Sequence, residues 1–410
     1  MAPATPRAPA FPSRMDGVQA PIVSVIGEMI RQSPDTISLG QGIVRYGPPP
    51  AAMQAVKAAL ATPSTHQYQD GHGLPALREA LGRKLREENG IDVTRGSRVM
   101  ITAGANMAFM HAVMAVTEPG DEIVLPLPFY FNHEMAIQMA GCRAVLVPTD
   151  ARYQLRLDAI RDAITDRTRA IVTVSPNNPT GAVSTEASLR DVNALCRERG
   201  LYHLADEAYE YFTYGSARHV SPGSFSDAAA HTISMYSLSK AYGFAGWRVG
   251  YVVYPEHLAA AMIKSQDTIL ICPPIVSQVA ALAAVEVGRA YCEPFLRELS
   301  ETRELALGSL EGLGSLAAVP PADGAFYLFL KIDDEAIRAA GGPVRMTPLA
   351  MAQRLIREHR VAVIPGSAFG LTEGCYFRVA YGALEKRTVA EGIGRLVEGL
   401  RAMLGRPRAI

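Results

Sequence analysis

The feature that most constrains the fold is a series of short, apolar, β-rich segments that recur between residues 98 and 254, with helical patterns between several of them. Most lack polar alternation, which is typical of strands buried on both faces. The seven segments are 98–102, 122–127, 144–147, 170–174, 201–205, 232–236 and 249–254. This alternation predicts an α/β fold with a mainly parallel sheet between helices, and a ligand site beyond the carboxyl ends of the strands.

A second pattern follows the last of these strands. Residues 259 to about 312 indicate helix throughout, except at Cys272-Pro273-Pro274. An α+β pattern comes next, with strands near 325–331, 361–364 and 376–381, a helix at 348–359 and a closing helix from Leu384. We therefore expect three parts: a large domain over 51–290, a smaller α+β domain over 21–50 and 291–410, and a disordered Pro- and Ala-rich tail over 1–20.

The charge balance argues against large polyanionic partners. The chain has 40 Lys and Arg residues and 40 Asp and Glu residues, so its formal net charge is zero. Nucleic-acid binding and polybasic membrane binding need a positive surplus. No stretch approaches the roughly 18 to 20 apolar residues of a spanning helix, and the five cysteines form no CxxC pair. We expect a cytoplasmic globular protein without nucleic-acid or membrane partners.

Several common catalytic motifs do not occur in the sequence. It contains no HExxH, GxSxG or GxxxxGK(S/T), and its nine histidines show no metal-ligand spacing within a Cys/His cluster. Residues 312–317 match a loose dinucleotide pattern, but they follow a helix rather than a strand. We expect no metal site, and simple dehydrogenase chemistry is poorly supported.

The lysines give a short list of candidate catalytic residues: Lys57, Lys84, Lys240, Lys264, Lys331 and Lys386. Only Lys240 directly follows a strand-like run with two hydroxyls, Ser237 and Ser239, just before it. Arg248 follows eight residues later, and nearby glycines leave room for close backbone approach. These neighbours suit an aldehyde that carries a phosphate, such as pyridoxal 5'-phosphate.

Three further segments agree with this interpretation: 175–181 (SPNNPTG), 206–209 (DEAY) and 377–380 (FRVA). Together with Lys240 they resemble, in the same order, the motifs of fold-type-I pyridoxal-phosphate-dependent aminotransferases of class I/II, the aspartate aminotransferase superfamily. The resemblance runs from about Ser38 to the C-terminus. It implies a transaminase that moves an amino group between an L-amino acid and a 2-oxo acid by ping-pong chemistry.

The resemblance assigns the central chemistry to two residues. Lys240 would hold the cofactor as a Schiff base and later move the proton between the substrate Cα and the cofactor as general base and acid. Asp206 would stay ionised beside the pyridine nitrogen and keep it protonated, so that the ring accepts electrons. The alternatives are an exposed, ion-paired lysine and a helix-capping or turn aspartate.

Other motif positions would bind the remaining groups of the cofactor. Asn178 and Tyr209 would donate to its phenolic oxygen; the alternatives are a turn asparagine and a core tyrosine. Ser237, Ser239 and Arg248 would bind the phosphate.

Residues Gly104, Ala105 and Asn106 lie where a strand gives way to a helix, so their backbone N–H groups could complete the phosphate site. Tyr130 matches the family position that stacks on the pyridine ring; its alternative is core packing, with Phe129 or Phe131 as the stacking residue. His133 resembles a position near Asp206 in some members, but a structural histidine is an equal reading, so we leave it outside the expected site.

Three residues are expected to contact the substrate or the neighbouring subunit. Arg378 would clamp the substrate carboxylate in a planar two-bond contact, and the backbone of Gly42 would meet the same group. Tyr68 matches the family tyrosine that reaches the phosphate of the neighbouring subunit, which implies a homodimer with shared active sites. The alternatives are a buried structural arginine, a turn glycine and a loop tyrosine.

Substrate choice is less constrained. Dicarboxylate specialists of the family carry a second arginine six residues before a Pro-Pro pair, where this chain has Asp267. We therefore expect broad specificity that favours neutral or aromatic amino acids, with Arg45 or a mobile arginine available for glutamate, and with 2-oxoglutarate or pyruvate as acceptor. A β-elimination enzyme such as a carbon–sulfur lyase, a cyclopropane-forming synthase and the sensor domain of a transcription regulator remain alternatives on the same fold.

Overall fold

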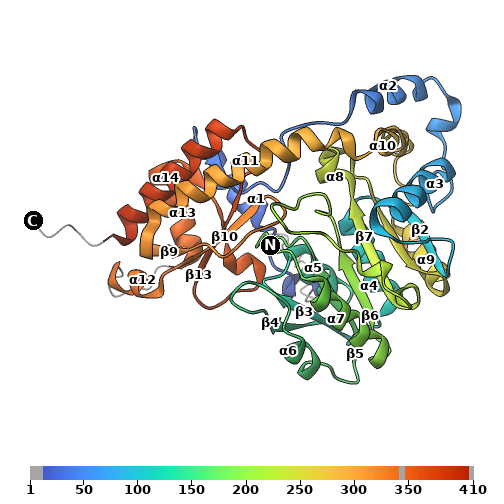
Figure 1. Ribbon diagram of the computed structural model, residues 1–410, viewed down its shortest axis with the longest axis horizontal. Helices are drawn as coiled ribbons and strands as arrows, with labels where there is room; N and C mark the ends of the chain where they lie inside the picture. Colours follow the sequence, from blue (N-terminus) through green and yellow to red (C-terminus); the bar gives the residue numbers. More distant parts are fainter. Residues whose placement is uncertain (1–12, 341–346, 406–410) are drawn as a thin grey trace, which may run out of the picture.

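The computed structural model describes residues 13–340 and 347–405. Its seven principal strands are β2 (Ser97–Thr102), β3 (Glu122–Leu127), β4 (Arg143–Pro148), β5 (Thr168–Val174), β6 (Tyr202–Asp206), β7 (Thr232–Ser237) and β8 (Gly250–Pro255). They form one sheet in the order β2-β8-β7-β6-β5-β3-β4 (Figure 1). β8 runs antiparallel to β2 and β7, and the other pairings are parallel. The predicted fold class is confirmed, and each predicted strand end lies within two residues of the observed one.

Helices cover both faces of this sheet, because both faces of its strands are apolar. The helices of one face are α4 (Ala105–Val116), α5 (Phe131–Met139) and α9 (Ala259–Ile269), and those of the other include α6 (Leu157–Asp162) and α7 (Glu186–Arg199). Neighbouring residues of β3 show the division, since Ile123 packs with the first group and Val124 with the second. This is why the strands read as continuous apolar runs.

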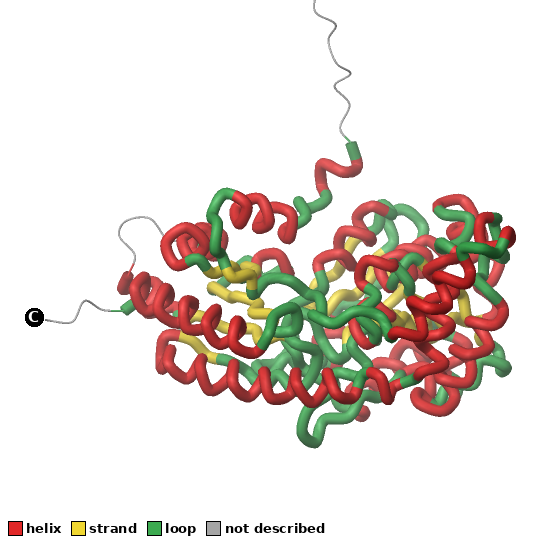
Figure 2. Tube along the Cα trace, turned by 90° about the horizontal axis from the view of Figure 1, so that it is seen from above, coloured by secondary structure: helices red, strands yellow, loops and turns green. Residues whose placement is uncertain are grey.

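Three more helices cover the β2 side of the sheet. They are α2 (Pro50–Ala59), α3 (Pro75–Lys84) and α10 (Ile275–Val287), and α10 packs against both of the others. Figure 2 shows helices on both sides of the strands when the molecule is seen from above.

A smaller antiparallel sheet lies beside the first. It contains β9 (Ala317–Ala318), β10 (Tyr327–Ile332), β12 (Ile364–Pro365) and β13 (Cys375–Ala380) in the order β12-β13-β10-β9. Its helices are α11 (Glu293–Leu310), α12 (Asp334–Ala340), α13 (Pro348–His359) and α14 (Lys386–Leu404), seen toward the left of Figure 1. The N-terminal segment joins this part of the molecule, since α1 (Ile22–Arg31) packs on α13 and β1 (Ile37–Ser38) pairs with β11 (Val361–Ala362).

Two expectations differ from the structure. The helical segment after residue 259 breaks at Gly288 as well as at the Pro-Pro pair, because Gly288 adopts a φ of 76° that ends α10. The predicted disordered tail is wrong for residues 13–20, since a capping box between Ser13 and Asp16 supports the short helix Arg14–Gly17. The rest of that prediction, residues 1–12, lies outside the described residues.

The helices were also compared with the dimensions of a bilayer. Within the described part of the chain, none is both long enough and apolar enough to cross a membrane.

Candidate active site

A cavity of about 200 Å³ lies where the carboxyl ends of β5, β6 and β7 approach the smaller sheet. All the predicted site residues except Gly104 and Tyr68 line it. Those that do are Gly42, Ala105, Asn106, Tyr130, Asn178, Asp206, Tyr209, Ser237, Ser239, Lys240, Arg248 and Arg378. The structure therefore brings together motifs from across the sequence at the edge of the sheet that the βα pattern indicated.

Lys240 is positioned by the short helix α8 (Leu238–Ala241), which begins where β7 ends. The hydroxyl of Ser237 caps this helix by accepting a hydrogen bond from the N–H of Ser239 (3.1 Å). The hydroxyl of Tyr46 lies 3.0 Å from the Lys240 carbonyl oxygen. Nζ of Lys240 donates to the carbonyl of Gly42 (2.5 Å), so the amine lies between α8 and the N-terminal segment.

The cavity lowers the basicity of this amine. Burial is the largest cause of a fall in the pKa of Lys240 from 10.5 to about 8, Arg378 and Arg248 lower it further, and Asp206 opposes them. These four are the charged side chains that line the cavity, three cations and one anion. A lysine with this pKa has a large neutral fraction near pH 8, and the neutral amine is the nucleophilic form.

Asp206 is buried at the last position of β6, where it meets a histidine. Nε2 of His133 lies 3.0 Å from Oδ2 of Asp206, and the N–H of Ala208 donates to Oδ1 (3.0 Å). His133 is itself held by stacking on Phe109, with ring centroids 4.0 Å apart. Tyr130 lines the cavity close by and meets the His133 ring edge-on at 5.2 Å. The sequence had left His133 unassigned, and the structure places it in contact with Asp206.

The opposite end of the cavity is suited to a phosphate. Nη1 of Arg248 lies 3.4 Å from the hydroxyl of Ser239, beside the N-terminus of α4. Gly104 precedes that helix with a φ of 78°, and a Cβ built on it would come within 2.6 Å of Nη2 of Arg248. Gly104 therefore lies against the arginine rather than in the cavity wall. The helix N-terminus, the serine hydroxyls and the guanidinium together favour an anion.

Arg378 is a buried cation without an anionic partner. Its side chain is 2% exposed on β13, Nη1 donates to Oδ1 of Asn178 (2.8 Å) and Nη2 donates to the carbonyl of Gly40 (2.6 Å). No carboxylate of the described residues lies within ion-pair distance, and Nε has no hydrogen-bond partner. A buried and uncompensated charge is costly, so this site is suited to bind a carboxylate.

Four residues of the cavity were missed by the sequence: Val23, Val174, Ala208 and Tyr327. Phe131, named from the sequence only as an alternative stacking residue, also lines the cavity. Tyr327 is the most informative of them. Its hydroxyl lies 2.6 Å from that of Tyr209, and the Arg378 guanidinium lies 4.7 Å above its ring centroid. Tyr327 precedes Phe329 by two residues, and Phe329 is the β10 partner of Arg378. Only this strand register could have placed Tyr327 beside Arg378, and the register cannot be known before the strands are paired.

Some candidate residues lie away from the cavity. The side chain of Tyr68 is 78% exposed in this single chain and does not line the cavity. Asp267 is exposed on α9, and Arg45 pairs with Glu298 instead of facing the cavity. In residues 13–340 and 347–405, no group of three His, Cys, Asp or Glu side chains could hold a metal ion.

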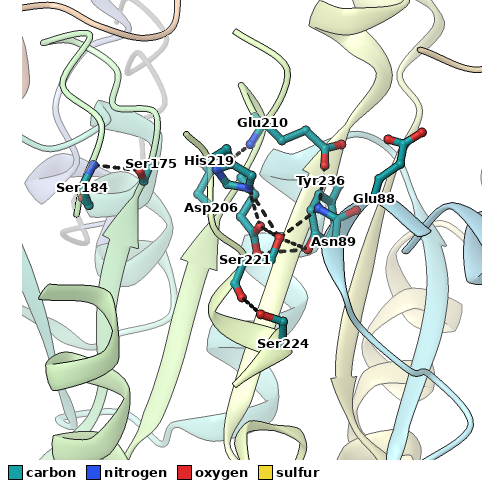
Figure 3. A network of polar contacts seen from close by, with 12 residues as sticks. Glu88, Asn89, Ser175, Ser184, Asp206, Glu210, His219, Ser221, Ser224 and Tyr236 are labelled. Carbon is teal, nitrogen blue, oxygen red and sulfur yellow. Dashed lines mark hydrogen bonds and ion pairs between the residues drawn. The ribbon is translucent and has the colours of Figure 1, made fainter. Parts of the chain in front are cut away.

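A buried polar network supports the end of β6 from behind. Glu207, the neighbour of Asp206, contacts His219 (2.9 Å), the hydroxyl of Ser221 and the hydroxyl of Tyr236 on β7 (3.1 Å). Ser221 continues the network toward Asn89 (2.9 Å), and Figure 3 shows it between His219 and Asn89. The network ties the loop after β6 to β7 and to the segment after α3, so the strand ends that carry the site are fixed together.

Comparison with known proteins agrees with this geometry. Residues 34–396 match the family described as aminotransferase class I and II. The aromatic aminotransferase ISS1 of Arabidopsis thaliana is 33% identical, with 95% of both chains covered. The probable aspartate/prephenate aminotransferase of Aquifex aeolicus is 35% identical, with 91% of this chain and 93% of that protein covered.

A solved structure gives the same result for the fold. The structure of aspartate aminotransferase from Thermus thermophilus with maleate is 29% identical, has a TM-score of 0.86 and covers 96% of this chain and 100% of its own. The family match spans most of the sequence, and both relatives cover nearly the full length. The chain therefore belongs to the class I and II aminotransferases and is a transaminase.

Proposed function

We propose that this transaminase binds pyridoxal 5'-phosphate at Lys240 and transfers the amino group of a neutral or aromatic L-amino acid to a 2-oxo acid. One observation carries the proposal: the cavity holds Lys240, Arg248 and Arg378 against the single carboxylate Asp206. In the part of the chain that the structure describes, the two arginines beside this lysine have no carboxylate partner. This arrangement suits an anionic aldehyde at one end and a substrate carboxylate at the other. The family itself is dependent on pyridoxal phosphate.

The residues present fit this cofactor. Arg248, Ser237, Ser239 and the N–H groups at the N-terminus of α4 (residues 104–106) would bind its phosphate. The requirement for glycine at position 104 supports this assignment, because a side chain there would displace the arginine. Tyr130 would pack on the face of the ring.

When bound, pyridoxal phosphate supplies a carbonyl carbon that receives amino groups and a ring that withdraws electrons. The chain's residues would tune both. Asp206, oriented by His133, would hold a proton at the pyridine nitrogen. Asn178 and Tyr209 would donate hydrogen bonds to the phenolic oxygen. The Lys240 amine would accept the proton from the substrate Cα and deliver it to the cofactor.

The substrate would be oriented by its carboxylate. Arg378 would clamp that group, with the backbone of Gly42 close by, and so hold the Cα–H bond in the direction from which Lys240 can reach it. Val23 and Phe131 add apolar surface to the cavity, and no cation of residues 13–340 and 347–405 lines it other than the three already assigned. These features support a neutral or aromatic side chain rather than a second carboxylate.

We further propose a homodimer with shared active sites, in which Tyr68 of each chain reaches the phosphate bound by its partner. The support is a set of exposed apolar side chains on two helices that pack together. Met53 and Leu60 lie on and just after α2, Val287 ends α10, which packs on α2, and all three are exposed.

We also propose that the chain divides into a large domain over residues 51–290 and a small domain made of residues 21–50 and 291–410.

Half-reaction spectroscopy tests the activity and the cofactor together. Protein loaded with pyridoxal phosphate should absorb visible light, and an excess of phenylalanine alone should convert one equivalent of cofactor to the pyridoxamine form and release one equivalent of 2-oxo acid. Lys240→Ala should lose the bond that borohydride reduces. A wild-type protein that stays colourless with the cofactor contradicts the proposal. Aspartate preferred by several orders of magnitude would refute the substrate class alone.

A further inference from the structure

Two tyrosines from different sheets share a hydrogen bond at the cavity wall. The hydroxyl of Tyr209, in the turn after β6, lies 2.6 Å from the hydroxyl of Tyr327 on β10. Tyr209 is 5% exposed and Tyr327 is fully buried. Across residues 13–340 and 347–405, neither hydroxyl has a second hydrogen-bond partner. The pair therefore forms an isolated two-member unit that faces the cavity.

A count of hydrogens shows what this unit offers to a ligand. Burial raises the pKa of Tyr209 well above 10 and that of Tyr327 to about 12, so both phenols keep their hydrogens at neutral pH. Two hydrogens serve one hydrogen bond between the oxygens. One hydrogen is left without an acceptor, and a buried donor without an acceptor is costly. The direction of the shared hydrogen bond decides which tyrosine presents the free hydrogen.

The surroundings favour Tyr327 as the donor within the pair. A Cβ built on Gly42 would lie 2.5 Å from the Tyr327 hydroxyl oxygen, so the backbone of Gly42 closes that side. Tyr209 faces the reactive amine instead, with Nζ of Lys240 5.9 Å from its ring centroid. The guanidinium of Arg378 lies over the ring of Tyr327, and a cation there makes the phenol a stronger donor.

We propose that Tyr327 is a positioning residue: it donates its hydroxyl hydrogen to Tyr209, so that the hydrogen of Tyr209 points into the cavity toward the phenolic oxygen of the cofactor. This inference rests on the proposed binding of pyridoxal phosphate. A phenol that accepts a hydrogen bond is a better donor to a third atom, because chains of hydrogen bonds polarise one another. Tyr327 thereby strengthens the contact of Tyr209 with the phenolic oxygen and stabilises the negative charge there.

The effect is measurable in the colour of the loaded protein. Hydrogen-bond donation to the phenolic oxygen stabilises its negative charge and so favours loss of the proton that this oxygen shares with the Lys240 nitrogen. Weaker donation therefore raises the pH at which the visible absorbance changes. The other groups facing Lys240 and Tyr209 are Asp206, Arg248, Arg378 and Tyr130, which remain in place when only the Tyr327 hydroxyl is removed. The titration midpoint therefore reports this one hydrogen bond.

The test compares the absorbance titrations of loaded wild-type protein, Tyr327→Phe and Tyr381→Phe. Tyr327→Phe keeps the ring beneath Arg378 and removes only the donor. Its midpoint should rise by about 0.4 to 1 pH unit, the shift expected for one hydrogen bond. Tyr381→Phe is the matched control, because Tyr381 is also fully buried, has its hydroxyl 3.4 Å from the Ala325 carbonyl oxygen and does not line the cavity. Its midpoint should stay at the wild-type value.

A double-variant cycle tests the route through Tyr209. In a Tyr209→Phe background, the further change Tyr327→Phe should leave the midpoint unmoved, because the hydroxyl that it positions is gone. An equal shift in both backgrounds, or no shift in the single variant, overturns the inference. A wild-type protein with no visible band to titrate overturns the proposed function and the inference with it, so the two failures can be told apart.

Discussion

Nη1 of Arg378 lies 2.8 Å from Oδ1 of Asn178, and this contact joins β13 of the smaller sheet to the turn that follows β5 of the larger one. The guanidinium is buried, yet its partners are neutral oxygens and aromatic rings. The ligand-free protein therefore holds a positive charge at some cost in stability, and a carboxylate that enters the cavity relieves this cost.

Changing Arg378 should separate substrate binding from stability. Arg378→Lys keeps the charge but loses the planar pair of donors, so kcat/KM for an amino acid should fall by about two to three orders of magnitude. Arg378→Met should lose at least as much activity, while the cofactor-free protein melts no lower than wild type, because the uncompensated cation is gone. Steady-state kinetics and thermal unfolding measure the two effects.

Arg303 provides the matched control for this prediction. It is also largely buried, but it pairs with Asp323 (2.9 Å) outside the cavity. Arg303→Met should lower the melting temperature and leave kcat/KM near the wild-type value. A large stability loss in Arg378→Met, similar to that of Arg303→Met, would show that Arg378 is mainly structural.

The sequence was sufficient for the residues that follow the strand ends. Asp206 and Ser237 end neighbouring parallel strands, and such ends meet at one edge of a sheet, so their convergence follows from the βα pattern. The place of Arg378 came from resemblance, because it belongs to a different sheet.

Tyr327 and His133 could not be assigned in the same way. The role of Tyr327 depends on the register of β10 against β13, and a slip of one residue would turn its side chain away. His133 reaches Asp206 through the packing of α5 on the sheet, which no local pattern encodes. The helix end at Gly288 was missed because a local pattern was misleading: one glycine in a long apolar helical pattern is usually tolerated.

Lys240 should make the cofactor-free protein more stable as the pH rises. Its pKa is about 8 in the folded chain and 10.5 ordinarily, so between these values the unfolded chain binds a proton that the folded chain does not. The free energy of unfolding should therefore increase from about pH 8 to about pH 10.5, by roughly 1 to 3 kcal/mol once solvent screening is allowed for. Urea unfolding at several pH values measures this increase.

Lys240→Gln supplies the reference, because it cannot titrate. The difference in unfolding free energy between wild type and Lys240→Gln should change over this pH window and stay constant below it. The rate at which wild-type protein captures pyridoxal phosphate should rise through about pH 8. A rate that rises only near pH 10.5 would contradict the lowered pKa of Lys240.

The network behind the site contains a buried ion pair whose removal should be costly. Nζ of Lys84 lies 2.5 Å from Glu210 and 2.8 Å from Oδ1 of Asn89, and the Lys84 side chain is 8% exposed. Lys84→Met would leave Glu210 without a cation, which should destabilise the protein by about 3 to 5 kcal/mol in urea unfolding. Adding Glu210→Gln should restore most of the loss.

Lys386 offers the matched surface pair for comparison. It lies 3.0 Å from Glu301, but both side chains are well exposed, at 43% and 67%. Lys386→Met should cost less than about 1 kcal/mol. Equal losses for the two lysine variants would argue that the buried network contributes nothing beyond an ordinary surface ion pair.

Shared active sites predict rescue between inactive chains. Tyr68→Ala should lower activity about 10- to 100-fold through the loss of one hydrogen bond to a phosphate, and Lys240→Ala should abolish it. In a mixed dimer, the Tyr68→Ala chain keeps Lys240, and the Lys240→Ala chain keeps Tyr68. The site built on the Tyr68→Ala chain therefore contains Lys240 and receives Tyr68 from the other chain, so it is intact. Mixing the two variants under conditions of subunit exchange should therefore restore up to half of the wild-type activity.

The control mixes Lys240→Ala with Asp206→Ala. Both residues line the cavity of the same chain, so every site in that mixed dimer carries one of the two lesions. No rescue is expected there. Rescue in neither mixture, although the dimers have exchanged subunits, would show that Tyr68 does not reach the partner's site.

Gly104→Ala should weaken cofactor binding beyond its effect on stability. Gly104 combines a φ of 78° with a Cβ position only 2.6 Å from Nη2 of Arg248, so alanine both strains the backbone and displaces the phosphate-binding arginine. Gly215→Ala is the matched control, because Gly215 has a φ of 61° and open space around its Cβ position. Both variants should lose about 1 kcal/mol or more of stability, but only Gly104→Ala should raise the Kd for pyridoxal phosphate tenfold or more. Absorbance titration with the cofactor distinguishes the two variants. Equal Kd values would mean that Gly104 is needed only for the backbone conformation of the turn and not to leave room for Arg248.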